Sequence, residues 1–153
     1  MFTNMIAHSD GSEEVRRLFY EQVPELASGV VEIKAIARER GRRSKLAVHS
    51  NDPTVDPIGT LVGWRGILVK AVVQQLEGEK IDIFRWSESV EELIRHALHP
   101  TVVRSITFDA GGQSARITVD SLRSDAYSMD PGDPVGLRLA SRLVGWELEL
   151  VET

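Results

Sequence analysis

The sequence predicts an α+β protein built from two repeated units of about 70 residues each. Segments with the apolar period of a helix alternate along the chain with segments that have the two-residue period of a strand. Apolar residues and glycines also recur at fixed spacings, for which chance is the competing interpretation. An offset of 67 positions relates Val72 to Leu139, Leu76 to Leu143, Gly78 to Gly145, Ile81 to Leu148 and Ile83 to Leu150, and an offset of 71 relates Leu46 to Ile117 and Val48 to Val119.

The elements of the first unit are predicted from helix caps and breakers. Asp10 and Glu13 have the spacing of a capping box, and Pro24 ends the helix that follows them. Asp56 and Pro57 are typical of the N-cap and first residue of a short helix. The expected elements are a helix at 13–20, strands at 30–37 and 45–50, helices at 57–62 and 66–76, and a strand at 80–84.

The second unit is predicted to repeat this order. Ser89 and Glu92 form a capping box, Pro100 stops that helix, and Asp133 with Pro134 starts another. The expected elements are a helix at 89–98, strands at 103–108 and 115–119, a helix at 134–144 and a strand at 146–151. We therefore divide the chain into a flexible N-terminal tail at 1–12, a first domain at 13–86 and a second domain at 87–153.

Composition limits the class of protein. The chain has 153 residues, of which 42% are hydrophobic and 27% charged, as is typical of a globular protein. The absence of cysteine excludes thiol catalysis and cysteine zinc sites, and it fits a reducing, cytoplasmic compartment. No apolar run is long enough for a membrane span, and the first dozen residues lack the pattern of a signal peptide.

Basic residues are concentrated between positions 34 and 45. The net charge of −5 argues against non-specific coating of DNA, yet this segment holds six basic residues and one acid. Gly41 lies at its centre, between two segments of alternating apolar residues, so we expect a β-hairpin with a basic tip. The tip either contacts phosphates or is a solvated edge that its charges protect. Residues 101–153, by contrast, hold five Arg, no Lys and eight acids.

The loop Gly63–Gly66 is the strongest candidate site. It joins the short helix to a longer apolar helix, and a glycine at each end allows another backbone to approach closely. The free N–H groups at the start of the following helix favour an anion, and Arg65 adds a charged donor. KH domains clamp the backbone of single-stranded nucleic acid with such a loop. A plain helix–helix turn is the alternative.

Several stretches carry a family resemblance. VEIKAIARE, SNDP-x-VDP-x-G, G-x-RG and L-x-GEKIDI-x-x-WSE resemble the first KH domain of the NusA family of bacterial transcription factors. VRRLFYEQVPEL resembles the segment that leads into that domain, and SRLVGWELEL resembles the end of the second KH domain. The resemblance covers about residues 12–151. It implies two tandem type-II KH domains, each a three-stranded mixed sheet packed on helices.

The sequence departs from the family pattern in three ways. The polymerase-binding and OB-fold domains of typical members are missing, as in an excised fragment or a stand-alone short form. Trp64 stands where the family has a small residue or Pro, and it either stacks on a base or ribose or shields the helix. In the second unit Met129–Pro134 replaces the loop: Asp130 and Asp133 would repel a phosphate, and Pro134 has no N–H. We expect that unit to keep its KH fold and to support the first domain or to bind protein.

Other candidate residues are expected to be structural. His96 and His99 are three residues apart near a helix end, but no third ligand accompanies them, so we expect no metal site. Trp86 and Trp146 are expected in core or inter-domain packing. The sequence has no nucleotide-binding or catalytic motif, and we expect neither a cofactor nor an enzyme activity.

Two functions remain open. In the first, which the resemblance implies, the protein binds single-stranded RNA, such as a nascent transcript, and acts with RNA polymerase in elongation, pausing, termination or antitermination. The expected RNA contacts are Gly63, Trp64, Arg65, Gly66, Lys70, Arg38, Arg42, Arg43 and Lys45. In the second, the KH pair has lost most of its RNA affinity and binds RNA polymerase or another transcription factor. Binding through one clamp is expected to be weak and to decrease with salt.

Overall fold

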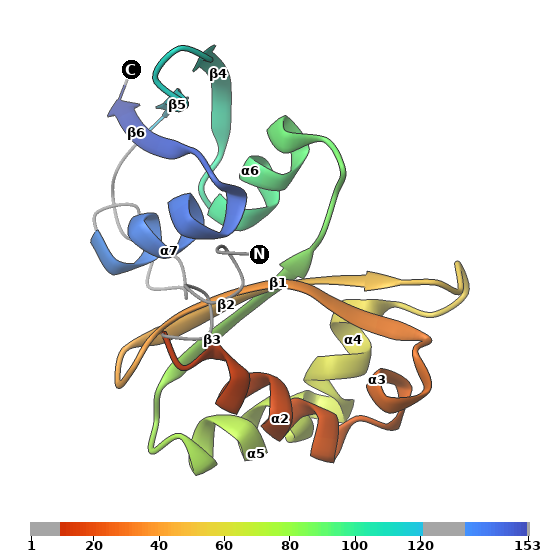
Figure 1. Cartoon of the computed structure of the whole chain (residues 1–153). Helices are drawn as coiled ribbons and strands as arrows, with labels where there is room; N and C mark the ends of the chain where they lie inside the picture. Colours follow the sequence, from red (N-terminus) through yellow and green to blue (C-terminus); the bar gives the residue numbers. More distant parts are fainter. Residues whose placement is uncertain (1–9, 121–133, 153) are drawn as a thin grey trace. The chain divides into compact units, whose positions relative to one another are not determined.

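The computed structural model describes residues 10–120 and 134–152. The chain divides into two compact units, Met1–Trp86 and Ser87–Thr153. Each unit has its own three-stranded mixed sheet with helices packed on it, which confirms the α+β prediction (Figure 1). None of the described helices has the length and apolar character that a membrane span needs.

The first unit packs its described helices against one face of its sheet (Figure 1). Strand β1 (Val31–Glu39) pairs antiparallel with β2 (Arg43–Ser50), which pairs parallel with β3 (Lys80–Arg85). The helices are α2 (Ser12–Gln22), α3 (Pro24–Ser28), α4 (Pro57–Val62) and α5 (Ile67–Gln75), with a 3-10 turn η1 (Trp64–Gly66) between the last two. Because parallel strands need a crossover connection, α4, η1 and α5 form the link from β2 to β3.

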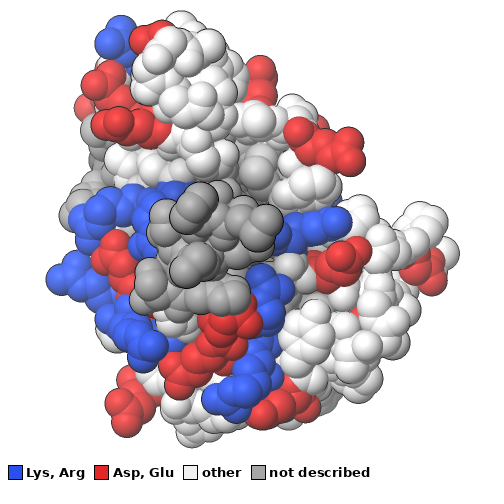
Figure 2. All heavy atoms as spheres, viewed as in Figure 1, with Lys and Arg blue, Asp and Glu red and all other residues white. Residues whose placement is uncertain are grey.

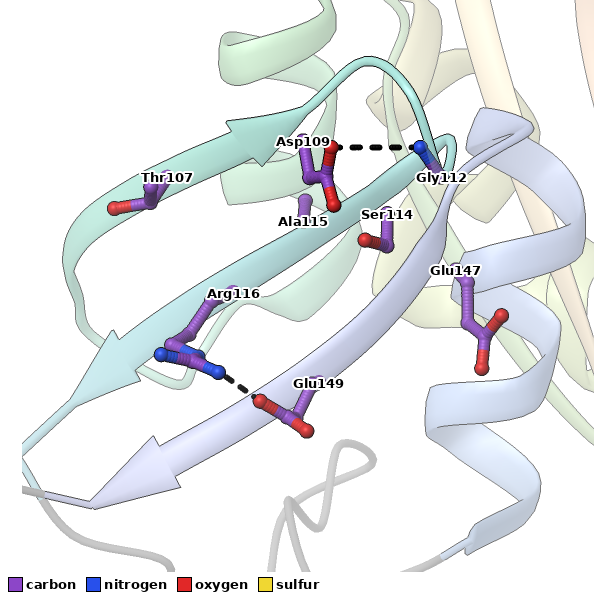
Figure 3. A pocket seen from close by; sticks show the side chains of 8 residues that line it. All are labelled: Thr107, Asp109, Gly112, Ser114, Ala115, Arg116, Glu147 and Glu149. Carbon is purple, nitrogen blue, oxygen red and sulfur yellow. Dashed lines mark hydrogen bonds and ion pairs between the residues drawn. The ribbon is translucent and has the colours of Figure 1, made fainter.

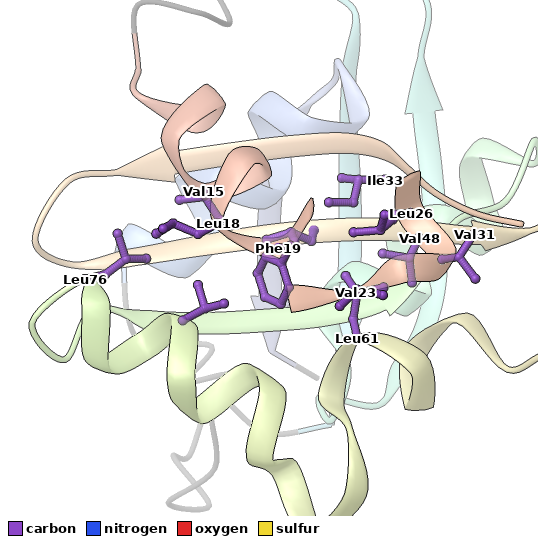
Figure 4. Close-up of a cluster of buried hydrophobic side chains, with 12 residues drawn as sticks. Val15, Leu18, Phe19, Val23, Leu26, Val31, Ile33, Val48, Leu61 and Leu76 are labelled. Atoms are coloured by element: carbon purple, nitrogen blue, oxygen red, sulfur yellow. The ribbon is translucent and has the colours of Figure 1, made fainter. Parts of the chain in front are cut away.

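The core of the first unit lies between the sheet and these helices (Figure 4). Val15 and Phe19 of α2 pack there with Leu46 of β2, at the helical and strand spacings that the sequence periodicity predicts. Leu61 of α4 and Val72 of α5 are fully buried in the same cluster. Full burial of such a side chain stabilises a fold by about 1.5–3 kcal/mol. Both helices beside the loop Gly63–Gly66 are therefore anchored to the sheet.

The second unit has the same sheet topology. Strand β4 (Val103–Asp109) pairs antiparallel with β5 (Ser114–Val119), which pairs parallel with β6 (Glu147–Glu152). Helices α6 (Val90–Leu98) and α7 (Pro134–Val144) contact each other, and they contact β4 and β6 respectively. Ile94, Ile117 and Leu139 are fully buried in this unit.

The strand registers confirm the internal repeat. Leu46 pairs with Ile83 in the first sheet, and Ile117 pairs with Leu150 in the second. These are the residues that the two sequence offsets relate to each other. Each antiparallel pair also has one register irregularity in its first strand. The two parallel strand pairs are therefore built in the same way.

The start of the first described helix differs from the prediction. Gly11, with φ 84°, precedes α2 in place of Asp10. The carboxylate of Asp10 instead accepts hydrogen bonds from the backbone N–H of Ser12 at 2.9 Å and of Arg38 at 3.2 Å, so it ties the helix to β1. Pro24 ends α2 as predicted, but it also begins α3, which was not predicted. Proline favours the first helical position as well as the residue after a helix.

Two other predicted caps are confirmed. Asp56 accepts a hydrogen bond from the N–H of Ile58 at 3.1 Å, and Ser89 accepts one from the N–H of Glu92 at 3.3 Å. The boundaries of the predicted helices and strands lie within two residues of those in the structure. Most of the predicted tail at 1–12 lies outside the described residues.

Candidate nucleic-acid interface

The loop Gly63–Gly66 has no space for a side chain at Gly63 but has space at Gly66, where the left-handed backbone favours Gly, Asn or Asp. Gly63 has φ 78° and ψ 172°, a conformation that is essentially restricted to glycine. The side chain of Leu68 also fills the space beside Gly63, because a Cβ at this position would lie 2.6 Å from Cγ of Leu68. Gly66 has φ 76° and ψ 15° in the left-handed region, and the nearest neighbour of a Cβ there would be 3.5 Å away, on Lys70. Position 66 therefore has room for a side chain, and position 63 has none.

The side chains of the loop form an exposed aromatic and basic cluster. Trp64 is 74% exposed, and the guanidinium carbon of Arg65 lies 4.5 Å from the centroid of its ring. Arg65 itself has φ 56°, an unusual conformation for a residue with a side chain. The ammonium of Lys70 donates a hydrogen bond to the backbone oxygen of Arg65 at 3.3 Å. In the described part of the chain, no carboxylate forms an ion pair with Arg65 or Lys70.

The start of α5 adds backbone donors to this cluster. No described side chain caps the helix, and the N–H of Ile67 bonds to the backbone oxygen of Trp64. The N–H groups that follow in the first turn have no partner within the helix, and the helix dipole gives this end a partial positive charge. Together with Arg65 and Lys70, they make the loop suited to an anion such as a phosphate.

Two grooves run along α5 and share Lys70 and Gln74. The larger groove, of about 760 Å³, lies between α5 and β3, and we call it the β3 groove. It is lined by Val69, Lys70, Val73, Gln74, Glu77, Gly78 and Ile81. The smaller groove, of about 410 Å³, starts at the loop, and we call it the Trp64 groove. It is lined by Trp64, Arg65, Ile67, Lys70, Ala71 and Gln74.

The predicted basic hairpin exists, and β1 and β2 meet at a turn that contains Gly41. The guanidinium of Arg38, however, is 5% exposed and bound on all sides. It donates two hydrogen bonds to the carboxylate of Glu79, both at 2.9 Å. It also donates to a carboxylate oxygen of Glu14 at 2.7 Å and to the backbone oxygen of Gly11 at 2.8 Å. Arg38 therefore joins the hairpin to α2 and to the residue that precedes β3.

The same network shifts the pKa values of Arg38 and Glu14. Burial lowers the pKa of Arg38, but the hydrogen bonds and charges of Glu79 and Glu14 outweigh burial, so the pKa of Arg38 is raised. The hydrogen bond from Arg38 in turn lowers the pKa of Glu14. Arg38 and Glu14 are thus held as an ion pair at neutral pH.

Two more of the predicted hairpin contacts are paired internally. Arg43 and Lys45 lie on β2, and both donate to the same carboxylate oxygen of Asp82, at 2.9 Å and 3.1 Å. All three side chains are buried. Moving either cation to a phosphate would break a buried, charge-assisted hydrogen bond, which is costly. On the face seen in Figure 2, basic and acidic side chains lie next to one another on the surface of the first unit.

The structure therefore separates the nine predicted RNA contacts into two groups. Gly63–Gly66 and Lys70 lie together at the start of α5. Of the four hairpin residues, only Arg42 is exposed, and its backbone oxygen accepts a hydrogen bond from Lys80 at the start of β3. Arg38, Arg43 and Lys45 are buried and hydrogen-bonded to acids of the same unit, so we leave them out of the interface proposed below.

The second unit has a groove of different character on its sheet (Figure 3). This groove, of about 510 Å³, is lined by Thr107, Asp109, Gly112, Ser114, Ala115, Arg116, Glu147 and Glu149. Arg116 donates to Glu149 at 3.0 Å, so the basic residue of this lining is paired. The excess of acids disfavours a phosphate, and no group of three or more His, Asp or Glu among the described residues is suited to hold a metal ion. The predicted degenerate clamp at Met129–Asp133 lies outside the described residues, as does the side chain of Pro134.

The two other tryptophans pack within their own units. The ring of Trp86 makes an edge contact with His49, at 6.0 Å between centroids, and the ammonium of Lys34 lies 5.2 Å from its centroid. Trp146 makes an edge contact with Phe108 at 4.9 Å. Both rings are half-buried. They therefore differ from Trp64, whose ring faces solvent.

Sequence comparisons relate this chain to transcription factors. A family model of the NusA-like first KH domain matches residues 10–86. The chain is 45% identical over 139 residues to the transcription termination/antitermination protein NusA of Thermus thermophilus, and 38% identical over 136 residues to the protein of that name from Bacillus subtilis. The two alignments cover 90% and 89% of this chain, but 35% and 36% of the relatives, so the chain spans about a third of their length.

A solved structure shares the fold. The crystal structure of APE1850 superimposes on this chain with a TM-score of 0.54 and 18% identity, and the match covers 88% of this chain and 96% of that one. At this identity the likeness concerns the fold alone. Together with the repeated sheet topology, it confirms the prediction of tandem KH domains.

Proposed function

The chain belongs to the family of NusA-like first KH domains, and from this premise we propose that its first unit binds single-stranded RNA through the loop Gly63–Gly66. One observation carries the proposal. Behind a loop that requires glycine, the uncapped start of α5 lies beside two cations, Arg65 and Lys70, that no described carboxylate pairs. This combination of backbone donors and available charge suits the phosphates of a nucleic acid.

In this proposal the RNA backbone lies against the loop. Phosphate oxygens accept hydrogen bonds from the first turn of α5, while Arg65 and Lys70 neutralise their charge. A base enters the β3 groove, where Val69, Val73 and Ile81 supply an apolar surface. The outer edge of β3 has no strand partner among the described residues of the unit, so its backbone is free to bond to a base. Arg42, exposed at the hairpin turn, provides a further contact.

The names of the relatives indicate the process. They are called transcription termination/antitermination proteins, so we propose that the RNA is a nascent transcript and that the chain acts in elongation, pausing, termination or antitermination. RNA polymerase or another transcription factor is the proposed protein partner. With one described clamp, the affinity for RNA is expected to be modest and to decrease with salt, with a slope of about 0.7 per neutralised phosphate.

The test uses two substitutions of equal shape at Gly66. Asn and Asp both tolerate the left-handed conformation of this residue, and the space beside it admits either side chain. Gly66→Asp places a negative charge at the anion site and is expected to weaken binding of short single-stranded RNA at least about tenfold, whereas Gly66→Asn retains most of the affinity. Titration of fluorescently labelled RNA oligomers at low and physiological salt measures the difference. Gly63 is unsuitable because its Cβ contact with Leu68 would confound binding with folding.

Equal affinities of the two variants contradict the proposal. If the wild-type chain binds no single-stranded RNA but is retained by RNA polymerase, the alternative function, a protein-interaction module, replaces it. Circular dichroism and thermal unfolding of both Gly66 variants establish that any loss of binding reflects charge and not misfolding.

A further inference from the structure

We propose that the Trp64 groove is a second nucleobase site, in which a base stacks on Trp64 while its neighbour occupies the β3 groove. This inference rests on the proposed RNA binding of the loop. It gives a role to a tryptophan that a backbone clamp does not require, and it adds a nucleotide to the stretch of RNA that the first unit contacts.

The first support is the exposure of two large apolar side chains at one place. Trp64 is 74% exposed and Ile67 is 60% exposed, and both line the same groove. The indole remains exposed even though Arg65 lies 4.5 Å from its ring centroid. An aromatic ring held beside a guanidinium presents a flat surface on which bases of any kind stack. Exposed apolar side chains that lie together on the surface are often part of a binding site.

The second support is the placement of the groove along α5. Ile67, Ala71 and Gln74 are spaced by three or four residues and lie on one face of the helix. Val69 and Val73 line the β3 groove on the neighbouring face. Lys70 lines both grooves. A phosphate bound at Lys70 therefore has one groove on each side, and the two nucleosides that it joins are directed into different grooves.

The third support is the chemistry of the lining. The Trp64 groove contains two cations and no acid, which favours a polyanion as its occupant. Gln74 provides an amide that both donates and accepts hydrogen bonds, as the edge of a base requires. An apolar protein segment would leave both cations without a counter-charge. The lining therefore favours a nucleotide over a hydrophobic peptide.

The test combines Trp64→Ala with RNA oligomers in which each nucleotide in turn lacks its base. In the wild-type chain, loss of the base at one position is expected to weaken binding at least about fivefold. Trp64→Ala is expected to weaken binding of intact RNA by a similar factor. This variant is then expected to bind intact RNA and RNA that lacks that base with equal affinity. Trp64→Phe, which keeps an aromatic ring, is expected to retain most of the affinity. Because Trp64 is exposed, these substitutions leave the fold intact.

Three results would overturn the inference. The first is a Trp64→Ala variant that binds RNA with the wild-type affinity. If Gly66→Asp still weakens binding, the proposed function of the loop remains supported. The second is a Trp64→Ala effect that is equal on intact and abasic RNA at every position, since the ring would then contact the backbone. The third is unchanged RNA affinity with lost retention on RNA polymerase, which assigns the groove to protein. If the wild-type chain binds no RNA at all, the proposed function fails together with the inference.

Discussion

The hairpin at 34–45 and the loop Gly63–Gly66 are both basic, yet they use their charge in opposite ways. In the hairpin, Arg38, Arg43 and Lys45 are buried and paired with acids that come from other elements. In the loop, no described acid pairs Arg65, and it lies against an exposed ring. The hairpin holds the greater number of cations, but three of its six form buried pairs that stabilise the fold. The difference shows that the number of basic residues in a segment does not measure the charge it offers to a ligand.

The two regions are nevertheless connected through the sheet. Glu79 precedes β3 and binds Arg38 through both carboxylate oxygens, and it also accepts hydrogen bonds from the backbone N–H of Gly41 and the hydroxyl of Ser44. These bonds hold β3 beside the hairpin, and β3 forms one wall of the β3 groove. The hairpin thus supports the interface without contributing most of its charge to it.

Of the substitutions that test the difference between hairpin and loop, Glu79→Ala is expected to have the largest effect, a loss of stability of the first unit. The substitution removes the carboxylate that accepts two hydrogen bonds from the buried guanidinium of Arg38, so the free energy of unfolding of the first unit is expected to fall by about 3 kcal/mol or more. Urea unfolding combined with hydrogen exchange of the amides in β1 and β2 measures the loss and assigns it to this unit. Arg42→Ala, at an exposed position of the same hairpin, is the control and is expected to change stability by less than about 0.5 kcal/mol. A Glu79 variant as stable as that control would show that the hairpin network is not structural.

A smaller effect is expected from Lys70→Gln on RNA binding. If Lys70 neutralises one phosphate, its removal reduces the slope of log affinity against log salt concentration by about 0.7. Arg17→Gln, which removes one exposed cation from α2, is the matched control and is expected to leave that slope unchanged. Salt titrations of both variants with one RNA oligomer decide the matter. An equal change in both slopes would mean that the general field of the protein, and not the loop, attracts the RNA.

The smallest effect concerns the pH dependence of the hairpin network. The lowered pKa of Glu14 means that its ion pair with Arg38 contributes stability above the ordinary pKa of Glu, about 4.3, and loses it as the pH falls through the lowered value. Wild type is therefore expected to be more stable than Glu14→Gln at pH 7, with the difference vanishing in acid. The difference is expected to be small because the side chain of Glu14 is 43% exposed. Unfolding of both proteins across this pH range measures it, and a constant difference would contradict the assignment.

The sequence allowed most of the fold to be predicted because the relevant signals are local. Asp56 caps α4 through a residue two positions away, and the repeat relates Leu46 and Ile83 to their counterparts by spacing alone. Pro24 was misjudged because one residue type both ends and begins helices. The loop Gly63–Gly66 could be predicted for the same reason as the caps: its signal lies in four consecutive residues and does not depend on distant parts of the chain.

The internal pairing of the hairpin was not predicted because its partners are distant in the sequence. Arg38 and Glu79 are separated by 41 positions, and only the fold brings them together. The spacing was misleading for Asp82, because an acid that alternates with isoleucines on a strand has the pattern of a solvated residue, whereas its side chain is buried. The grooves beside α5 were missed as well, although the helical spacing of Ile67 and Gln74 places them on one face.

The parallel pairing of β2 with β3 also determines when the interface forms during folding. Strands β1 and β2 pair across a short turn. Strands β2 and β3, by contrast, pair from Arg43 and Lys80 onward only after the whole crossover of α4, η1 and α5 has closed. Such distant pairing is slow and comes after local contacts. Leu68 of α5 fills the space beside Gly63, and α5 is anchored to the sheet by the burial of Val72. A chain with a complete hairpin but an undocked β3 has its basic segment and lacks one wall of the β3 groove, so the proposed RNA site is complete only once β3 has docked.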